Sequence, residues 1–148
     1  MVELTNWDRK FMAMCDLIAS WSKDKSKKVG AVIVDSDNRV LSTGYNGLPI
    51  GCNDNVESRH IKPKKNSFVV HAEANPIYSC AKSGIKTKGS TMYLTWYPCC
   101  DCCKAIIQSG ISKIMCYEPD WNDDSWGESF RYTKEMLAEA NIEVVFCN

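Results

Sequence analysis

The chain has 148 residues, with 18 basic and 18 acidic side chains, nine cysteines and two histidines. This length suits one domain that buries a core without disulfide bonds, so we predict a single domain over residues 1–148. Balanced charge argues against the binding of long nucleic acid, which a strong positive excess normally accompanies. No apolar run approaches the roughly 20 residues that span a bilayer, and the first residues show no leader pattern. We therefore expect a cytoplasmic protein without a membrane partner, whose cysteines are core residues, metal ligands or reactive thiols.

The hydrophobic pattern alternates between helical and strand periodicity. Apolar residues at three- and four-residue steps indicate helices, the first of them capped by Thr5 or Asn6, and short β-branched runs bounded by turn residues indicate strands. The predicted helices cover residues 7–21, 72–82, 99–109 and 129–140, and the predicted strands cover 29–34, 39–45, 91–96, 113–117 and 142–146. Two strands followed by helix–strand alternation predict an α/β fold, a three-layer α/β/α sandwich with a mixed sheet of about five strands.

Residues 46–67 interrupt this alternation with a concentration of glycine, proline and asparagine. A loop of about 20 residues inside a compact domain is uncommon, and loops of this kind usually carry function. We therefore predict an irregular functional segment at this place in the chain.

Two overlapping C-x-x-C pairs lie in Pro98-Cys-Cys-Asp-Cys-Cys103, where a predicted strand gives way to a helix. The pair Cys99 and Cys102 projects about 100° away from the pair Cys100 and Cys103, so one ion can take only one pair. The first pair lies at the helix start, where free backbone N–H groups and the helix dipole favour thiolates. We therefore interpret Cys99 and Cys102 as ligands, and Cys100 and Cys103 as packing residues.

A second motif, His71-Ala-Glu73, also lies where a strand-like segment turns into a helix. One imidazole and two thiolates leave the fourth tetrahedral position of a zinc ion open, which a catalytic zinc requires. Glu73 is too close to His71 to be a comfortable co-ligand and is the candidate proton carrier. The alternatives are a redox dithiol, a structural zinc with Cys100 or Cys103 as a fourth ligand, and a second zinc at Cys52 and His60.

His-x-Glu followed by Pro-Cys-x-x-Cys resembles the signature of zinc-dependent nucleobase deaminases. The likeness extends through Gly44–Pro49, Arg59–Tyr78 and Met92–Cys99, so nearly the whole chain resembles the cytidine and deoxycytidylate deaminase family. One departure from the family pattern is Pro76, which removes a backbone N–H near the start of the helix and predicts an irregular first turn.

The resemblance implies a cytidine-deaminase-like fold and the hydrolysis of dCMP to dUMP and ammonia. Carried over by position, one Zn²⁺ is bound by His71, Cys99 and Cys102. Water attacks C4 of the pyrimidine while Glu73 carries the protons. The resemblance also implies a homohexamer that dCTP activates and dTTP inhibits.

The groups that recognise the base and the sugar are predicted from their chemistry. Asn46, between two glycines, suits the sugar 3′-hydroxyl, although it is equally well explained as a turn residue. The backbone of Ala72 offers an edge for the base, and Tyr97 or Trp121 a flat wall, with a core role for Trp121 as the alternative.

The phosphate and a triphosphate effector need cations. A guanidinium matches phosphate better than an ammonium does, which favours Arg59 or Arg131 over the lysines. The composition of the 46–67 segment also suits an effector nucleotide with Mg²⁺ near Asp54. The residues predicted for this effector site are Asn53, Asp54, His60 and Lys64.

Two other functions stay open from the sequence. One is a related zinc deaminase that acts on a tRNA adenosine, free cytosine, guanine or a riboflavin precursor. The other is a zinc-stabilised binding module in which Glu73 has no catalytic role. Balanced charge and the acidic segment 118–128 disfavour tRNA, which requires a continuous basic face.

Overall fold

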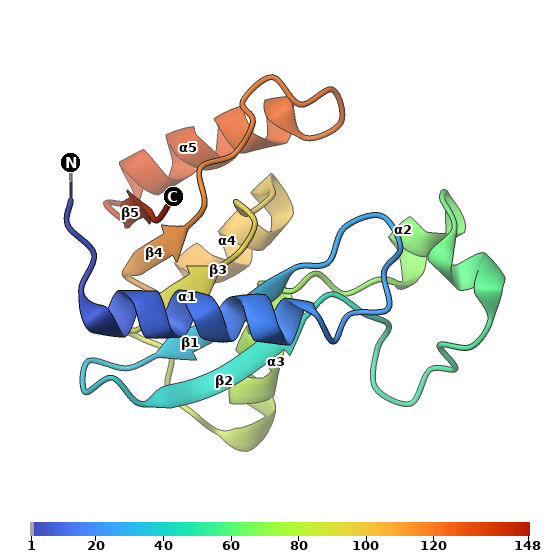
Figure 1. Cartoon of the computed structure of the whole chain (residues 1–148), viewed down its shortest axis with the longest axis horizontal. Coiled ribbons are helices and arrows are strands. Elements are labelled where there is room, and N and C mark those ends of the chain that lie inside the picture. The colour runs from blue at the N-terminus through green and yellow to red at the C-terminus, as the bar shows by residue number, and fades with distance from the viewer. Residues whose placement is uncertain (1) are drawn as a thin grey trace.

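A computed structural model describes residues 2–148, and its centre is a five-stranded mixed sheet (Figure 1). The strand order is β2-β1-β3-β4-β5, with antiparallel pairing from β2 through β1 to β3 and parallel pairing from β3 through β4 to β5. The strands are β1 (Gly30–Val34), β2 (Val40–Tyr45), β3 (Thr91–Leu94), β4 (Lys113–Cys116) and β5 (Glu143–Phe146). The predicted α/β class and five-stranded mixed sheet are confirmed.

Helices pack on both faces of the sheet because the central strands are apolar on both sides. All five residues of β1 are buried, and successive side chains from Ala31 to Val34 point in turn into two different core clusters, one on each face of the sheet. On one face Val32 and Val34 pack with α1, and on the other Ala31 and Ile33 pack with α3, α4 and α5. The main helices are α1 (Asn6–Ala19), α3 (Ala74–Ser83), α4 (Cys100–Gln108) and α5 (Gly127–Glu139). This is the predicted three-layer sandwich.

The first helix begins at a capping box and ends earlier than predicted. The Thr5 side chain accepts a hydrogen bond from the Asp8 backbone, and the Asp8 carboxylate accepts one from the Thr5 N–H. The helix ends at Ala19, and Trp21 lies beyond it with 55% of its surface exposed. The predicted end of this helix at residue 21 is therefore wrong by about half a turn.

The segment predicted to be irregular contains two short helices. These are the 3₁₀ helix η1 (Glu57–His60) and the α-helix α2 (Lys64–Phe68). The Arg59 guanidinium and the Lys64 ammonium both lie over the Phe68 ring, so the two helices share an aromatic centre that loop composition does not reveal. No helix within residues 2–148 is long and apolar enough to cross a bilayer.

Candidate active site

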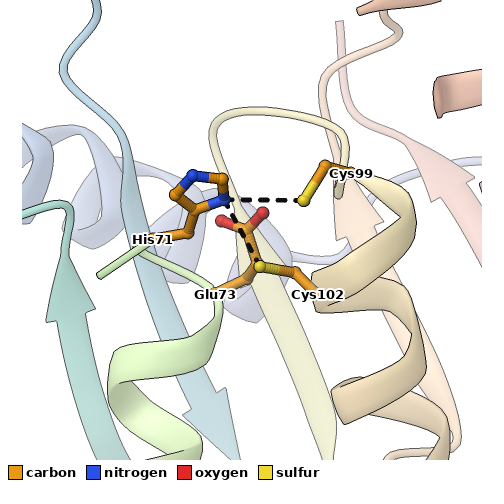
Figure 2. Close-up of side chains that lie close together, drawn as sticks. All are labelled: His71, Glu73, Cys99 and Cys102. Carbon is orange, nitrogen blue, oxygen red and sulfur yellow. Dashed lines mark hydrogen bonds between the residues drawn. The ribbon is translucent and has the colours of Figure 1, made fainter. Parts of the chain in front are cut away.

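The structure brings His71, Glu73, Cys99 and Cys102 into one cluster (Figure 2). One potential ligand atom from each residue lies within 4.8 Å of the others. His71 follows the bridge between Val70 and Gly47, while Glu73 and Cys99 are the residues at the N-caps of α3 and α4. The cluster therefore forms where two helix starts meet at one edge of the sheet. We call these four residues the metal cluster.

The spacing of the metal cluster fits a zinc ion. The Sγ atoms of Cys99 and Cys102 both lie 3.5 Å from Nδ1 of His71. A thiolate and an imidazole bound tetrahedrally to one Zn²⁺ at the usual bond lengths lie about 3.6 Å apart. Two sulfurs and one imidazole nitrogen are also donor types that zinc prefers. These residues can therefore hold a zinc ion and leave one position open.

Burial makes negative charge in the metal cluster costly. The pKa of Glu73 is raised to about 7, first by burial and then by the neighbouring Cys99 charge. Hydrogen bonds from Cys102 and His71 lower the pKa of Cys99 to about 4, whereas the hydrogen bond with ionised Cys99, together with burial, raises the pKa of Cys102. One thiol therefore ionises at the expense of the other, and a divalent cation between them removes this conflict.

Pro76 does not disturb the start of α3. The helix begins at Ala74 rather than at residue 72, so Pro76 lies in its first turn, where a backbone N–H has no intrahelical partner. The predicted irregular first turn is therefore wrong. A turn at residues 72–73 precedes the helix, and there the Ala74 and Asn75 N–H groups both bond to the His71 carbonyl. Gly44 makes room for this arrangement, because a Cβ there would lie 2.5 Å from Cδ of Pro76.

A cavity of about 330 Å³ adjoins the metal cluster. This volume lies at the lower end of the roughly 300–1,000 Å³ typical of small-molecule sites. His71, Ala72, Glu73 and Cys99 line it. Other lining residues include Asn46, two tryptophans, Trp96 and Trp126, and three lysines, Lys27, Lys62 and Lys65. We call these three lysines the lysine group.

Comparison with known proteins identifies the family. Residues 5–118 match the model of the cytidine and deoxycytidylate deaminase zinc-binding region. The chain belongs to this family. The predicted resemblance is thereby confirmed.

The alignments with individual relatives span most of this chain. Human deoxycytidylate deaminase is 38% identical over 135 residues, which span 88% of this chain and 75% of the human protein. An uncharacterised deaminase from the luxG 3′ region of Aliivibrio fischeri is 37% identical over 148 residues, with coverage of 97% and 95%. The crystal structure of the cyanophage S-TIM5 dCMP deaminase in complex with dCMP and dUMP matches with a TM-score of 0.77 at 28% identity, covering 98% of this chain and 100% of that one.

Asn46 and Ala72, the residues predicted to recognise the sugar and the base, lie beside the metal cluster. Both line the cavity. The Asn46 side chain also joins the ends of two strands, because its Oδ1 accepts from the Val29 N–H at 2.9 Å and its Nδ2 donates to the Lys27 carbonyl at 2.8 Å. The turn interpretation and the sugar interpretation are therefore compatible, since the amide keeps a second N–H and a second lone pair.

The aromatic wall differs from the prediction. Tyr97 is 2% exposed and packs in the core against Trp121 and Phe130, with ring centroids 5.3 and 5.6 Å away, so neither Tyr97 nor Trp121 lines the cavity. Tyr97 is close to the ligands in sequence, but its side chain points into the core beside α5. Trp126 lines the cavity instead, with its ring edge-on to His71 at a centroid distance of 6.0 Å.

Neither predicted arginine lines the cavity. The Arg131 Nη1 donates to the Trp121 carbonyl at 2.8 Å, and the Arg59 Nη1 donates to the Asn53 carbonyl at 2.8 Å. Both guanidiniums are thus engaged by backbone carbonyls outside the cavity, whereas the lysine group lines it. A guanidinium matches phosphate better than an ammonium does, but the positions of arginine and lysine side chains depend on how the loops pack, and the local sequence carries no signal for that packing.

Only two of the four predicted effector residues line a common cavity. Asp54 and His60 line a second cavity of about 90 Å³, whereas Asn53 and Lys64 do not. The Asp54 carboxylate pairs with Lys23 at 3.0 Å, and the Lys64 ammonium donates to the Ser58 hydroxyl. This cavity is well below the roughly 300 Å³ of ordinary ligand sites, so the single chain does not form a complete triphosphate site there.

The remaining cysteines do not extend the metal site. Cys103 is fully buried beside Thr133, and neither Cys100 nor Cys103 belongs to the metal cluster. Within residues 2–148 the metal cluster is the one group of three or more potential ligands, so Cys52 and His60 gain no further partner for a second zinc. The structure therefore gives no support to Cys100 or Cys103 as the fourth ligand of a structural zinc.

Proposed function

We propose that this chain is a dCMP deaminase that hydrolyses dCMP to dUMP and ammonia. The observation that carries the proposal is the metal cluster beside a nucleotide-sized cavity that the lysine group also lines. Membership of the deaminase family and the likeness to a phage enzyme whose structure contains dCMP and dUMP support it. Curated relatives named deoxycytidylate deaminase belong to the hydrolases that act on C–N bonds.

In this proposal His71, Cys99 and Cys102 hold one zinc ion. Zinc, when bound in such a site, acts as a Lewis acid that makes water a stronger nucleophile near neutral pH. Cys99 is the N-cap of α4 and Cys102 lies in its first turn, where free N–H groups and the helix dipole favour the negative charge that zinc-bound sulfurs carry.

Glu73 moves the protons. Its pKa of about 7 is close to neutral pH, so the carboxylate can take a proton from the attacking water and then release it. It gives this proton to ring N3 as the C4–O bond forms. It then takes the remaining proton from the new C4 hydroxyl and delivers it to the exocyclic amine, which leaves as ammonia when the C4–N bond breaks and the C4=O bond forms. Burial keeps the carboxylate away from bulk water during these transfers.

Three groups orient the nucleoside part of dCMP. The backbone of Ala72 offers hydrogen bonds to the base, and Trp126, edge-on to His71, supplies the aromatic wall that the sequence assigned to Tyr97 or Trp121. The second N–H or lone pair of the Asn46 amide binds the 3′-hydroxyl.

Lys27 and Lys62 are the proposed phosphate ligands. Lys65 lies 2.8 Å from the Asp24 carboxylate in a nearly buried ion pair, so much of its charge is already compensated. Neither Lys27 nor Lys62 forms an ion pair within the described part of the chain. The Lys27 ammonium lies over the Trp96 ring at 4.3 Å, which holds it at the cavity without neutralising it.

We include regulation by two triphosphate nucleotides in the same proposal. Activation by dCTP and inhibition by dTTP, each with Mg²⁺, rest on family resemblance and on Asp54 and His60 beside the second cavity. A homohexamer and a cytoplasmic location rest on the resemblance and on composition. Saturation curves for dCMP with and without each triphosphate test the effectors, and unchanged curves would remove them from the proposal.

The decisive experiment measures ammonia release from dCMP together with the zinc content of each protein. Zinc-loaded wild type should release ammonia, and Glu73→Gln should keep its zinc but lose about 10²- to 10⁴-fold in rate, because a proton carrier contributes that much. The control is Glu57→Gln, an exposed carboxylate on η1 outside the cavity, which should retain full activity.

The outcomes separate the alternatives. Equal rates for wild type and Glu73→Gln would overturn the mechanism. A zinc-loaded wild type inert toward dCMP but active on cytosine, guanine, a riboflavin precursor or a tRNA adenosine would identify the related deaminase instead. Zinc binding without activity on any of these substrates would indicate a binding module.

A further inference from the structure

Helix α5 contacts the backbone on both sides of Cys99. The Ser129 hydroxyl accepts a hydrogen bond from the Cys100 N–H at 2.8 Å, and the Thr133 hydroxyl donates one to the Pro98 carbonyl at 2.9 Å. Ser129 and Thr133 are four residues apart and so share one face of the helix. Thr133 is fully buried, so both groups of its hydrogen bond are shielded from water.

The contact from Ser129 replaces the N-cap hydrogen bond that a cysteine metal ligand at the start of a helix does not supply. The residue before the first turn normally offers a side-chain oxygen to the free N–H groups of that turn. Cys99 holds this position in α4, but its side chain makes no such hydrogen bond and its sulfur faces His71. Ser129 satisfies the Cys100 N–H from another helix, which leaves the Cys99 sulfur available to a metal.

A third contact fixes α5 itself against the same segment. Phe130 is fully buried, and its ring packs edge-on against Trp96 and Tyr97 with centroid distances of 5.6 Å in both pairs. Three residues of α5 thus hold residues 96–100 from one side. The family match ends at residue 118 and α5 begins at Gly127, so these contacts come from outside the region that the zinc-binding family model covers.

We propose that Ser129 and Thr133 are positioning residues for the metal ligand Cys99. The proposal rests on the assignment of Cys99 as a zinc ligand under the proposed function. The two hydroxyls hold the peptide groups on either side of Cys99, and this keeps its sulfur at the observed 3.5 Å from His71. Without them the Pro98–Cys100 backbone can rotate, and the metal must reorder it on binding. Outer contacts of this kind typically change metal affinity by about 10- to 100-fold.

The test starts from zinc-loaded, full-length protein and measures zinc affinity by competition with a chromophoric chelator. Ser129→Ala and Thr133→Val should each release zinc at about 10-fold lower chelator concentration, and Thr133→Ser, which keeps the hydroxyl, should resemble wild type. The control is Thr87→Val. It removes an equivalent hydroxyl-to-carbonyl hydrogen bond, from Thr87 to Ser109, at the far end of the same helix α4.

The outcomes distinguish positioning from general stabilisation. A structural role alone lowers the unfolding temperature of the metal-free and the zinc-loaded protein equally and leaves zinc affinity unchanged, and this result would overturn the proposal. A loss of affinity in Thr87→Val as large as in Thr133→Val would also overturn it. If Thr133→Val does not fold, the zinc affinity of Ser129→Ala still decides. A wild type that binds no zinc would instead refute the metal site itself.

Discussion

The metal cluster adjoins the cavity that the lysine group lines, but the two sets of residues are held in place by different forces. The metal cluster lies at the starts of α3 and α4, two helices that pack on the same face of the sheet. The lysine group comes from the segments 24–28 and 61–69, whose main polar link is the ion pair between Asp24 and Lys65. Core packing therefore fixes the groups proposed to bind zinc and carry protons, whereas charge fixes the groups proposed to bind phosphate. The two should respond differently to substitution, salt and pH.

The largest effect is expected from the overlapping cysteine pairs. Cys99→Ser should lose zinc and reduce deamination by on the order of 10³-fold, since metal catalysis contributes several kcal/mol and each ~1.4 kcal/mol is a factor of ten. Cys100→Ser makes the same chemical change one residue further on and should keep both zinc and activity. Zinc content and ammonia release measure both. Loss of zinc from Cys100→Ser but not from Cys99→Ser would show that the ligands are Cys100 and Cys103 rather than Cys99 and Cys102.

A smaller effect is expected at the lysine group. Lys62→Gln and Lys27→Gln should each raise KM for dCMP by about 10-fold or more, because a hydrogen bond to a charged group is worth roughly 1.5–3 kcal/mol. The same variants should leave KM for deoxycytidine unchanged, since that substrate has no phosphate. Arg131→Gln, whose guanidinium bonds to the Trp121 carbonyl, should not alter KM for dCMP. An increased KM in Arg131→Gln alone would restore the assignment made from the sequence.

The metal cluster was predictable because its information is local. Each half is a short motif at a junction between a strand and a helix, and such a junction places a side chain at a defined point of the sheet edge. The C-x-x-C spacing and the position of His71 before a helix indicate a possible three-ligand set. The resemblance to the deaminase family is what implies that the four residues meet. The alternation of strands and helices predicts the sheet for the same reason.

The other lining residues depend on contacts between distant segments. Asp24 and Lys65 are 41 residues apart, and nothing near either one in the sequence marks the pair. Trp121 and Trp126 are five residues apart in one acidic loop. Trp121 packs against Tyr97, 24 positions earlier, whereas the Ser125 and Trp126 N–H groups bond to the Asp123 carboxylate and Trp126 lines the cavity. The hydroxyl of Ser129 likewise has no motif that relates it to Cys100.

The smallest expected effect concerns the ion pair that holds the lysine group. Burial alone would raise the pKa of Asp24, but Lys65 and the N–H groups of Ser26 and Lys27 lower it below its usual value. Because the folded pKa is lower than the unfolded value of about 3.9, the ionised carboxylate stabilises the fold above that pH. This contribution disappears as pH falls through the folded pKa. We call the decrease of the unfolding free energy as pH falls from 5 to 3 the acid slope, and urea denaturation measures it. The acid slope of Asp24→Asn should therefore be smaller than that of wild type.

Salt separates this buried pair from an exposed one in the same region. The side chains of Asp24 and Lys65 are 7% and 12% exposed, whereas those of Asp54 and Lys23 are 42% and 61% exposed. Hydrogen bonding to Lys23 also lowers the pKa of Asp54, so Asp54→Asn is the matched control. High salt should remove the difference between wild type and Asp54→Asn but preserve the difference for Asp24→Asn, because solvent ions screen exposed charges far more than buried ones. Contributions of the metal cluster to the acid slope cancel in each comparison. An acid slope in Asp24→Asn equal to that of wild type at both salt concentrations would mean that packing of α2, rather than charge, holds the lysine group in place.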